Sequence, residues 1–355
     1  MIRASQNNFD LIRLLAASQV AVYHTIDVMN HPASESLAMK ILGLFPGVPI
    51  FFFISGFLIS RSYERSHQVY DYARNRVLRV FPALHVCVFL NLLLVAMTGY
   101  FDVHDVSLSQ LLALYIAKTT FAQFYNPDFM RSFGDGVLNG SLWTICVELQ
   151  FYLLVPVIYS VRARLNDDRA FSLFLFALAL ASVFINRALY GSQVQIGDSL
   201  GWKFLRVSFL PWFYMFLVGV LVQRHFEVIT TVMQKNGLLM FVILIYPIIA
   251  WIMRSGGMRF DNGMPPLVFF ALSVLTLAMA YARIPFPSIL GKNDISYGVY
   301  IYHMVVVNMF VYYGLKYSIG YVMLALLISY LLAVLSWLLV ERPAMSLKRG
   351  AYRHI

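Results

Sequence analysis

The sequence predicts an all-α protein, a bundle of about ten membrane-spanning helices. Hydrophobic residues make up 60% of the chain and charged residues only 12%, about half the charged share that is typical of soluble proteins. Apolar runs of about 20 residues, the length that crosses a bilayer, recur along the whole chain. Lysines and arginines gather in short clusters between these runs, which is the pattern that the positive-inside rule produces in a multi-span protein.

Ten of these apolar runs are long enough to span the membrane. They cover residues 10–29, 41–59, 80–99, 141–160, 170–189, 207–223, 237–253, 265–282, 295–315 and 319–340. An eleventh run, 107–124, is weaker and carries Lys118. If it crossed, the arginine-rich loop 162–169 would move to the side that is poor in basic residues, so we expect 107–124 to lie in the interface or to re-enter from outside. The ten remaining spans then place both termini in the cytoplasm.

The composition also limits the function. A net charge of +10 is compatible with a nucleic-acid partner, but no nucleic-acid-binding motif accompanies the basic residues, so we expect none. The two cysteines, Cys87 and Cys146, stand apart in apolar runs, and the spacing of a metal site is absent from the sequence. No linker leads to a polar region large enough for a soluble domain, so residues 1–355 are predicted to form one membrane domain that acts within the bilayer.

The first span carries charges that a membrane helix usually avoids. The stretch "NNFDLIRLLAASQVAVYHT" (7–25) contains Asp10, Arg13 and His24, and each charged group at bilayer depth costs on the order of 3 kcal/mol. Arg13 and His24 are eleven residues apart, which returns them to nearly the same helix face about 16 Å apart along the axis. With the N-terminus inside, Arg13 lies near the cytoplasmic end and His24 near the outer end. Either residue alone can be structural, Arg13 by snorkelling and His24 by a helix-packing hydrogen bond.

The fourth span brings a carboxylate to a similar depth. In "NGSLWTICVELQFYLLVPVIY", which enters from outside, Glu148 lies about 10 Å below the outer surface, and His24 lies about as deep in the first span. A carboxylate that orients a neutral imidazole is the arrangement used for general-base activation of a hydroxyl group. The alternative is a structural pair between Glu148 and an arginine.

Arginines cluster at the cytoplasmic start of the third span. In "YDYARNRVLRVFPALH", Arg76 and Arg79 are three residues apart, with Arg74 close by. Guanidinium groups stay charged and bind oxyanions with two hydrogen bonds, so this cluster suits the phosphates of a nucleotide-like donor. A solvated cluster that only sets the topology is the alternative.

The ninth and second spans hold further polar or unusual residues. The ninth span, "GKNDISYGVYIYHMVVV", places His303 near mid-membrane after Tyr297, and we expect His303 to be structural or pocket-lining rather than a second base. The second span, "FPGVPIFFFISGFLIS", contains Gly56 and other glycines and prolines that a regular helix avoids. Such residues mark either a cavity wall or a close helix packing, and the sequence leaves both open.

Taken together, these motifs resemble the acyltransferase-3 family, multi-span membrane enzymes that O-acylate cell-surface polysaccharides and other acceptors. The stretches "FDLIRLLAA" and "VYH", with Arg13 and His24, resemble the opening motif of the family. The stretch "GVPIFFFISGFLIS" resembles its second-helix motif. Its paired-arginine element is matched by Arg76, Arg79 and Pro82.

The resemblance extends from residue 8 to about residue 345. The stretch "SLWTICVELQFYLLVP" is similar to the fourth-helix signature of the family and supplies Ser141, Trp143 and Glu148. The stretches "ISYGVYIYH" and "VERP" match its closing motifs. One departure is "TIC" at 144–146, where members more often carry serine and small residues.

The resemblance implies a reaction that joins the two sides of the membrane. A cytoplasmic acyl-CoA, most simply acetyl-CoA, is the expected donor, with its phosphates near Arg13, Arg76 and Arg79; we expect no bound cofactor. His24, oriented by Glu148, is expected either to deprotonate the acceptor hydroxyl or to accept the acyl group transiently. The expected acceptor is a cell-surface or lipid-linked glycan, and the expected location is the bacterial cytoplasmic (inner) membrane. The expected pocket-lining residues are Asp10, Ser141, Trp143, Tyr297 and His303.

Two other functions remain open at this point. Intramembrane arginine, histidine and glutamate also form proton relays in transporters, although no internal repeat is visible here. A non-catalytic subunit of a polysaccharide export complex is the third possibility, and it predicts that substitutions at His24 are tolerated.

Overall fold

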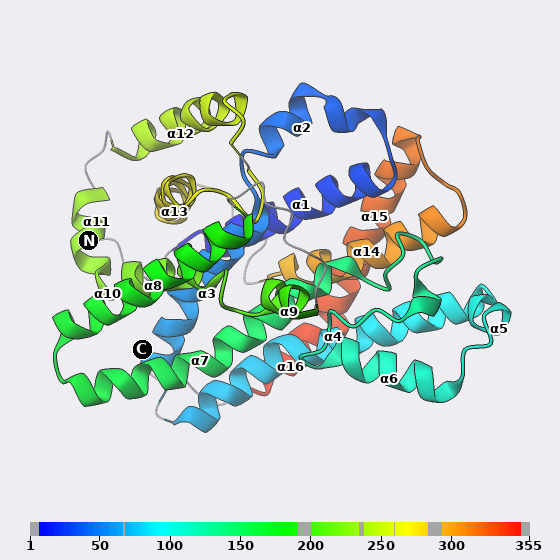
Figure 1. The fold of residues 1–355 in the computed structure, drawn as a ribbon, viewed down its shortest axis with the longest axis horizontal. Coiled ribbons are helices and arrows are strands. Elements are labelled where there is room, and N and C mark those ends of the chain that lie inside the picture. The colour runs from blue at the N-terminus through cyan, green and yellow to red at the C-terminus, as the bar shows by residue number, and fades with distance from the viewer. Residues whose placement is uncertain are drawn as a thin grey trace. The chain divides into compact units, whose positions relative to one another are not determined.

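The computed structural model describes residues 7–66, 68–190, 200–233, 238–258, 260–282 and 293–348, and over these residues the protein is all-helical (Figure 1). Every one of the ten predicted apolar runs contains a helix. These helices are α1 (Phe9–Val28), α3 (Gly47–Glu64), α4 (Val69–Met97), α7 (Trp143–Leu165), α8 (Asp168–Tyr190), α10 (Phe213–Arg224), α12 (Leu238–Ser255), α13 (Pro266–Ala280), α14 (Ser296–Tyr312) and α15 (Ile319–Ser336). The all-α prediction is therefore confirmed for the described residues.

Shorter helices connect these elements. They are α2 (Leu37–Leu42), α5 (Tyr100–Val103), α6 (Leu108–Thr119), α9 (Leu200–Val207), α11 (Phe226–Met233) and α16 (Arg342–Ser346), with 3-10 turns at Pro32–Glu35, Asp128–Met130 and Gly140–Leu142. A π-helical turn, η4 (Trp337–Glu341), follows α15 and leads into α16.

The lengths of the helices mark the chain as a multi-pass integral membrane protein. Among the described residues, five helical stretches are long and apolar enough to cross a bilayer: Leu37–Glu64, Val69–Met97, Gly140–Leu165, Asp168–Tyr190 and Ile319–Ser346. The other predicted spans correspond to shorter or more polar helices, so the number of ten crossings stays a prediction. Both termini lie outside the described residues, and their cytoplasmic location also stays a prediction.

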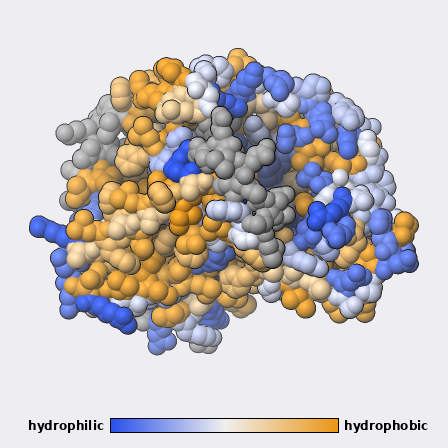
Figure 2. Space-filling model, in the orientation of Figure 1, coloured by the Kyte–Doolittle hydropathy of each residue, from blue (hydrophilic) through white to orange (hydrophobic). Residues whose placement is uncertain are grey.

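Helix α8 shows how the surface is adapted to lipid. One stripe of this helix is buried, as at Leu175 and Ala179, while large apolar side chains on the opposite stripe are more than half exposed: Leu173, Phe176, Leu180 and Phe184. Figure 2 shows hydrophobic residues gathered on the face where α8 runs in Figure 1. A continuous exposed apolar stripe of this kind indicates contact with lipid rather than water.

The chain divides into two compact units that alternate along the sequence. Unit 1 comprises the described parts of residues 1–16, 40–69 and 150–292, and unit 2 those of residues 17–39, 70–149 and 293–355. Helices α1 and α7 each contribute residues to both units. The single domain expected over residues 1–355 stays a prediction.

In unit 1, two glycines allow α3 and α10 to cross in close contact. A Cβ atom added at Gly56 would lie 1.9 Å from the backbone oxygen of Phe216, and one added at Gly219 would lie 2.2 Å from the backbone oxygen of Phe53. Small residues let helix backbones approach closely in membranes, where apolar lipid provides no strong hydrophobic drive for association. The structure therefore assigns Gly56 a packing role, which the sequence had left open.

An ion-pair network ties the ends of four unit 1 helices together. Arg162 of α7 and Arg224 of α10 each bridge two carboxylates, Glu64 of α3 and Asp168 of α8. Tyr159 also donates a hydrogen bond to Glu64, at 2.9 Å. These helix ends are predicted to face the cytoplasm, and the balance of positive and negative charges is consistent with a structural role for the network.

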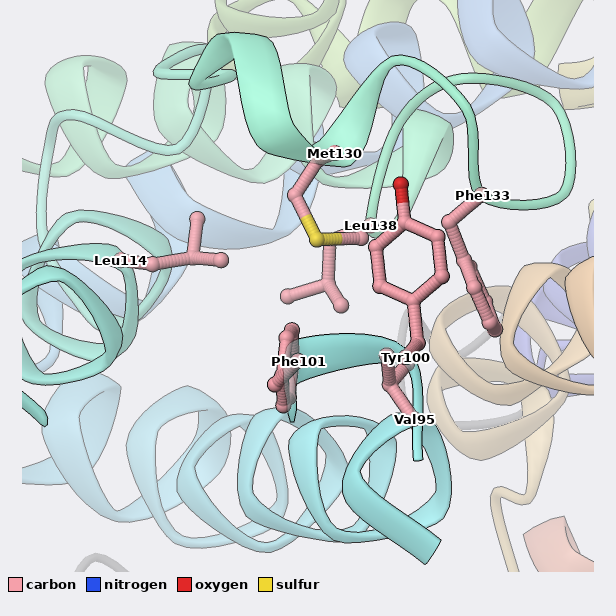
Figure 3. Close-up of a cluster of buried hydrophobic side chains, with 7 residues drawn as sticks. All are labelled: Val95, Tyr100, Phe101, Leu114, Met130, Phe133 and Leu138. Carbon is pink, nitrogen blue, oxygen red and sulfur yellow. The ribbon is translucent and has the colours of Figure 1, made fainter. Parts of the chain in front are cut away.

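In unit 2, the end of α4 packs with α5, α6 and the following loop around an apolar cluster. Its buried members are Val95, Tyr100, Phe101, Leu114, Met130, Phe133 and Leu138, and Figure 3 shows the Tyr100 ring between Met130 and Phe133. The Tyr100 hydroxyl donates a hydrogen bond to the Phe129 carbonyl at 2.6 Å, so the polar tip of this ring is satisfied. The cluster holds the loop that leads to α7.

Helix α6 lies within the weak eleventh run, 107–124. Its 12 residues give a length of about 18 Å, well short of the roughly 30 Å hydrocarbon core. Ser107 and Gln110 form a capping box at the N-terminus of this helix. Its length supports the prediction that this run does not cross the membrane.

Lys118 on α6 gives a pH-dependent prediction. Its side chain is buried, its Nζ donates to the Gln123 carbonyl at 2.7 Å, and burial lowers its pKa to about 8. The unfolded chain binds this proton up to a pH of about 10.4, so between pH 8 and 10 the unfolded state holds more protons than the folded state. Stability therefore rises with pH in this window, by about 2 kcal/mol from this group.

We expect Lys118→Met to reduce the rise in melting temperature between pH 8 and pH 10, measured by intrinsic fluorescence in detergent. Lys40→Met, at an exposed position, is the matched control and should keep the wild-type slope. An unchanged slope in Lys118→Met would contradict the assignment.

Candidate active site

Two histidines meet in the interior of unit 2. His24 of α1 and His303 of α14 are joined by a hydrogen bond of 3.0 Å between Nδ1 of His24 and Nε2 of His303. Their ring centroids are 5.3 Å apart, with an angle of 34° between the planes. His303 is completely buried, whereas His24 is partly accessible. Of the two residues, His24 is therefore the one that leaves part of its surface open to a reactant.

Contacts within α14 place the His303 ring. His303 Nδ1 lies 3.2 Å from the carbonyl oxygen of Val299, one turn earlier in α14. The Tyr300 ring packs edge-on against His303, with centroids 6.1 Å apart. The structure thus makes His303, which the sequence marked only as pocket-lining or structural, the direct partner of His24.

The start of α7 packs on the same part of α14. The Tyr300 hydroxyl and Thr144 Oγ1 are 2.6 Å apart, and Ser141 Oγ donates to Asn139 Oδ1 at 2.7 Å and lies 3.2 Å from the Tyr300 carbonyl. The charge of Glu148, further along α7, acts on Tyr300. Ser141 and Glu148 are therefore grouped around Tyr300, the neighbour of His303.

The hydrogen-bond partner that the structure gives the His24 ring is His303. An orienting role for Glu148 toward His24 stays a prediction, because the described interaction of Glu148 is with Tyr300. Trp143, the first residue of α7 and two residues after Ser141, is half-buried, and its pocket-lining role likewise stays a prediction.

Asp27 is an acidic neighbour that the sequence analysis did not single out. It follows His24 by three residues on α1, and its carboxylate acts electrostatically on His24. Asp135, in the loop before α7, has its pKa raised first by burial and then by Asp27, while Lys316 opposes the rise. The i, i+3 spacing in "HTID" is the signal that could have pointed to Asp27.

Arg79 lies between two carboxylates. Its guanidinium is 2.6 Å from Asp294 Oδ2 and 3.6 Å from Glu341 Oε2, and both acidic side chains are buried. Tyr297 presents its ring to Arg79 at 5.9 Å, and its hydroxyl donates to the Val80 carbonyl. The sequence analysis missed Asp294 and Glu341, although each lies beside or within a matched closing motif. A phosphate at Arg79 would have to compete with these carboxylates.

The remaining predicted arginines are placed as follows. Arg13 forms an i, i+3 ion pair with Asp10 at 2.8 Å, in the part of α1 that belongs to unit 1. Arg76 is half-buried on α4, in unit 2. Binding of one phosphate-bearing ligand by Arg13, Arg76 and Arg79 together therefore stays a prediction. Within the described part of the chain, no group of three or more His, Cys, Asp or Glu side chains is placed to hold a metal ion.

Comparison with known proteins links this chain to acyl transfer. A family model described as an acyltransferase domain matches residues 6–340. The chain is 32% identical over 365 residues to Nodulation protein 10 of Rhizobium leguminosarum bv. viciae, covering 97% of this chain and 94% of that protein. It is 27% identical over 351 residues to the O-acetyl transferase of Shigella phage Sf6, covering 95% of each.

A third relative is longer than this chain. The O-acetyltransferase OatA of Staphylococcus aureus (strain NCTC 8325 / PS 47) is 22% identical over 359 residues, which cover 94% of this chain and 56% of that protein. No solved structure gives a significant match to the chain.

Proposed function

This chain belongs to the acyltransferase-3 family, and on that premise we propose that it transfers an acyl group, most simply acetyl, from a cytoplasmic acyl-CoA to a glycan hydroxyl. That the chain is a membrane O-acyltransferase follows from the family and from relatives named as O-acetyltransferases. The donor and the acceptor are the proposed parts.

The observation that carries the proposal is the paired histidine centre that α1 and α14 form. His24 is partly accessible and hydrogen-bonded to a completely buried partner, His303. A positioned neutral imidazole can take a proton from a hydroxyl group, which makes the hydroxyl oxygen nucleophilic. In the proposed reaction this oxygen attacks the thioester carbonyl, the carbon–sulfur bond breaks, and the proton held by His24 leaves on the CoA thiol. Atoms and charges balance without any further reactant.

The donor is proposed to bind through its phosphates. Arg76 and Arg79 on α4, together with Arg13, are the basic residues that match the family motifs, and guanidinium groups grip phosphate oxygens with two hydrogen bonds. In this proposal the donor phosphates displace Asp294 or Glu341 from Arg79. The predicted topology then places the phosphates at the cytoplasmic end and His24 nearer the outer end.

The acceptor is proposed to be a glycan at the outer face of a bacterial cytoplasmic membrane. One relative, from Bacillus subtilis (strain 168), matches 42% of this chain and is named a putative peptidoglycan O-acetyltransferase. Its name supports a glycan as the acceptor class. The carboxylates of Asp27 and Asp135 lie within electrostatic range of each other, and Asp27 also acts on His24, so both are available to hold sugar hydroxyls.

The test uses the purified protein in detergent with acetyl-CoA labelled in its acetyl group. We expect saturable release of the CoA thiol, which a thiol reagent detects. We also expect transfer of label to a glycan fraction from the membrane. Heat-denatured protein is the control for spontaneous hydrolysis. A transporter has no reason to cleave a thioester, so an absence of thiol release with native protein and glycan would refute the proposal and favour transport.

A further inference from the structure

We propose that His303 is a positioning residue that holds His24 in the tautomer with an unprotonated Nε2 atom. This inference rests on the proposed function, because it assigns His303 a task within the same reaction. His303 does not touch the reactants in this scheme, since its side chain is completely buried. It acts through its hydrogen bond to His24.

His303 carries its proton on Nδ1. Its Nδ1 atom lies 3.2 Å from the Val299 carbonyl oxygen, and a carbonyl oxygen only accepts hydrogen bonds, so Nδ1 must carry the proton. A second proton would make the ring cationic, and a buried charge without a paired counter-ion is costly. The neutral ring therefore has an unprotonated Nε2, which can only accept.

The unprotonated Nε2 atom of His303 also fixes which nitrogen of His24 carries a proton. Nε2 of His303 lies 3.0 Å from Nδ1 of His24, and because Nε2 can only accept, Nδ1 of His24 must donate. A neutral imidazole has one N–H group, so the lone pair of His24 is left on Nε2. Nε2 is then the atom that receives the proton of the acceptor hydroxyl.

The opposite assignment is disfavoured by the same contacts. If His303 donated from Nε2, its Nδ1 lone pair would face the Val299 carbonyl oxygen at 3.2 Å, and two acceptors would oppose each other in a buried site. The Tyr300 ring packs against His303, which holds the ring where both hydrogen bonds form. In this relay, hydrogen-bond donation therefore runs from Nδ1 of His24 to Nε2 of His303, and from Nδ1 of His303 to the Val299 carbonyl oxygen.

The relay also acts while the reaction proceeds. When Nε2 of His24 takes a proton, the Nδ1–H group of the imidazolium still donates to His303, and a charged donor makes this hydrogen bond stronger. His303 does not take the proton, which passes from Nε2 of His24 to the CoA thiolate. The carboxylate of Asp27, which acts on His24 from the same helix, adds a favourable charge.

The test compares His303→Gln with His303→Phe. Glutamine can turn its Oε1 atom toward His24 as an acceptor, whereas phenylalanine fills the ring volume without one. We expect His303→Phe to lower kcat by about 100-fold or more with little change in the KM for acetyl-CoA. His303→Gln should recover a large part of this loss. Equal kcat in both variants would overturn the inference.

A second measurement reads the tautomer without activity. Nitrogen-15 NMR of histidine-labelled protein, with His24→Ala used to assign the His24 signals, reports which ring nitrogen carries the proton. We expect the Nδ1–H form in the wild type and in His303→Gln, and its loss in His303→Phe. An Nε2–H form of His24 in the wild type overturns the inference even if a variant fails to fold. The correct tautomer in a protein without transferase activity would instead refute the proposed function alone.

Discussion

Replacing His24 by alanine is expected to abolish acyl transfer while leaving folded protein in the membrane. His24 is the partly exposed member of the histidine pair, and its loss removes the proposed base from the reaction. General-base catalysis contributes roughly 10²- to 10⁴-fold to a rate, so turnover should fall by at least about 100-fold. The measurement is transfer of labelled acetyl groups to the glycan fraction by purified variant and wild type.

The substitution also leaves a buried acceptor without its donor. Nε2 of His303 loses the hydrogen bond from His24, which costs about 1–3 kcal/mol, so folding must be checked by size-exclusion chromatography and melting temperature. His85→Ala is the matched control, because His85 also forms a hydrogen bond between helices, to Tyr115 of α6, in unit 2. It should keep its activity. Full activity of folded His24→Ala would sink the assignment and favour a non-catalytic subunit.

Replacing Gly56 by alanine is expected to prevent stable folding. The added Cβ would lie 1.9 Å from the Phe216 backbone oxygen, far inside van der Waals contact, and a backbone atom can move only if α10 moves with it. Overpacking typically costs 1–3 kcal/mol and sometimes more, and here we expect about 3 kcal/mol or more. The measurement is the melting temperature and the yield of monodisperse protein in detergent.

Gly201 provides the control for a glycine on a helix. A Cβ added there meets nothing within 4 Å, so Gly201→Ala should leave the melting temperature unchanged or slightly raised, because alanine favours helix more than glycine does. Gly219→Ala should behave like Gly56→Ala, since it meets the Phe53 backbone from the opposite helix. A wild-type melting temperature for Gly56→Ala would mean that α3 and α10 do not pack this closely.

Much of the fold was predictable because membrane helices follow from local composition. A run of about 20 apolar residues must be helical in lipid, where each backbone polar group has to be satisfied within its own segment. For this reason each of the ten predicted runs contains a helix. The distribution of basic residues between the two sides of the membrane predicts that the weak run 107–124 does not cross. The short α6 is consistent with that prediction.

The site was predicted only in part. His24 could be singled out because a polar group in an apolar span is costly, and a cost of that kind points to function or to a specific partner. Its partner could not be identified from depth, because Glu148 and His303 both lie at depths within the bilayer that the sequence allows. Depth gives the height of a residue along a helix but not which neighbouring helix it faces. The structure brings His303 to His24 and groups Glu148 with Tyr300.

The arginines show the same limit. The pair Arg76 and Arg79 was recognised from its spacing in one segment, but the acidic partners of Arg79 come from the distant residues Asp294 and Glu341. Nothing in the local pattern around Arg79 indicates that its charge is already balanced.

The stretch 7–25 shows what local sequence determines and what tertiary packing determines. By itself the sequence determined that these residues form a helix, that Arg13 and His24 return to nearly one face, and that the polar groups need a reason to be there, because hydropathy and helical periodicity are local properties. Only the tertiary structure decided that His24 meets His303, that Asp294 and Glu341 flank Arg79, and that Gly56 lets α3 meet α10. These contacts join segments far apart in the chain, and their directions depend on how the helices pack around one another.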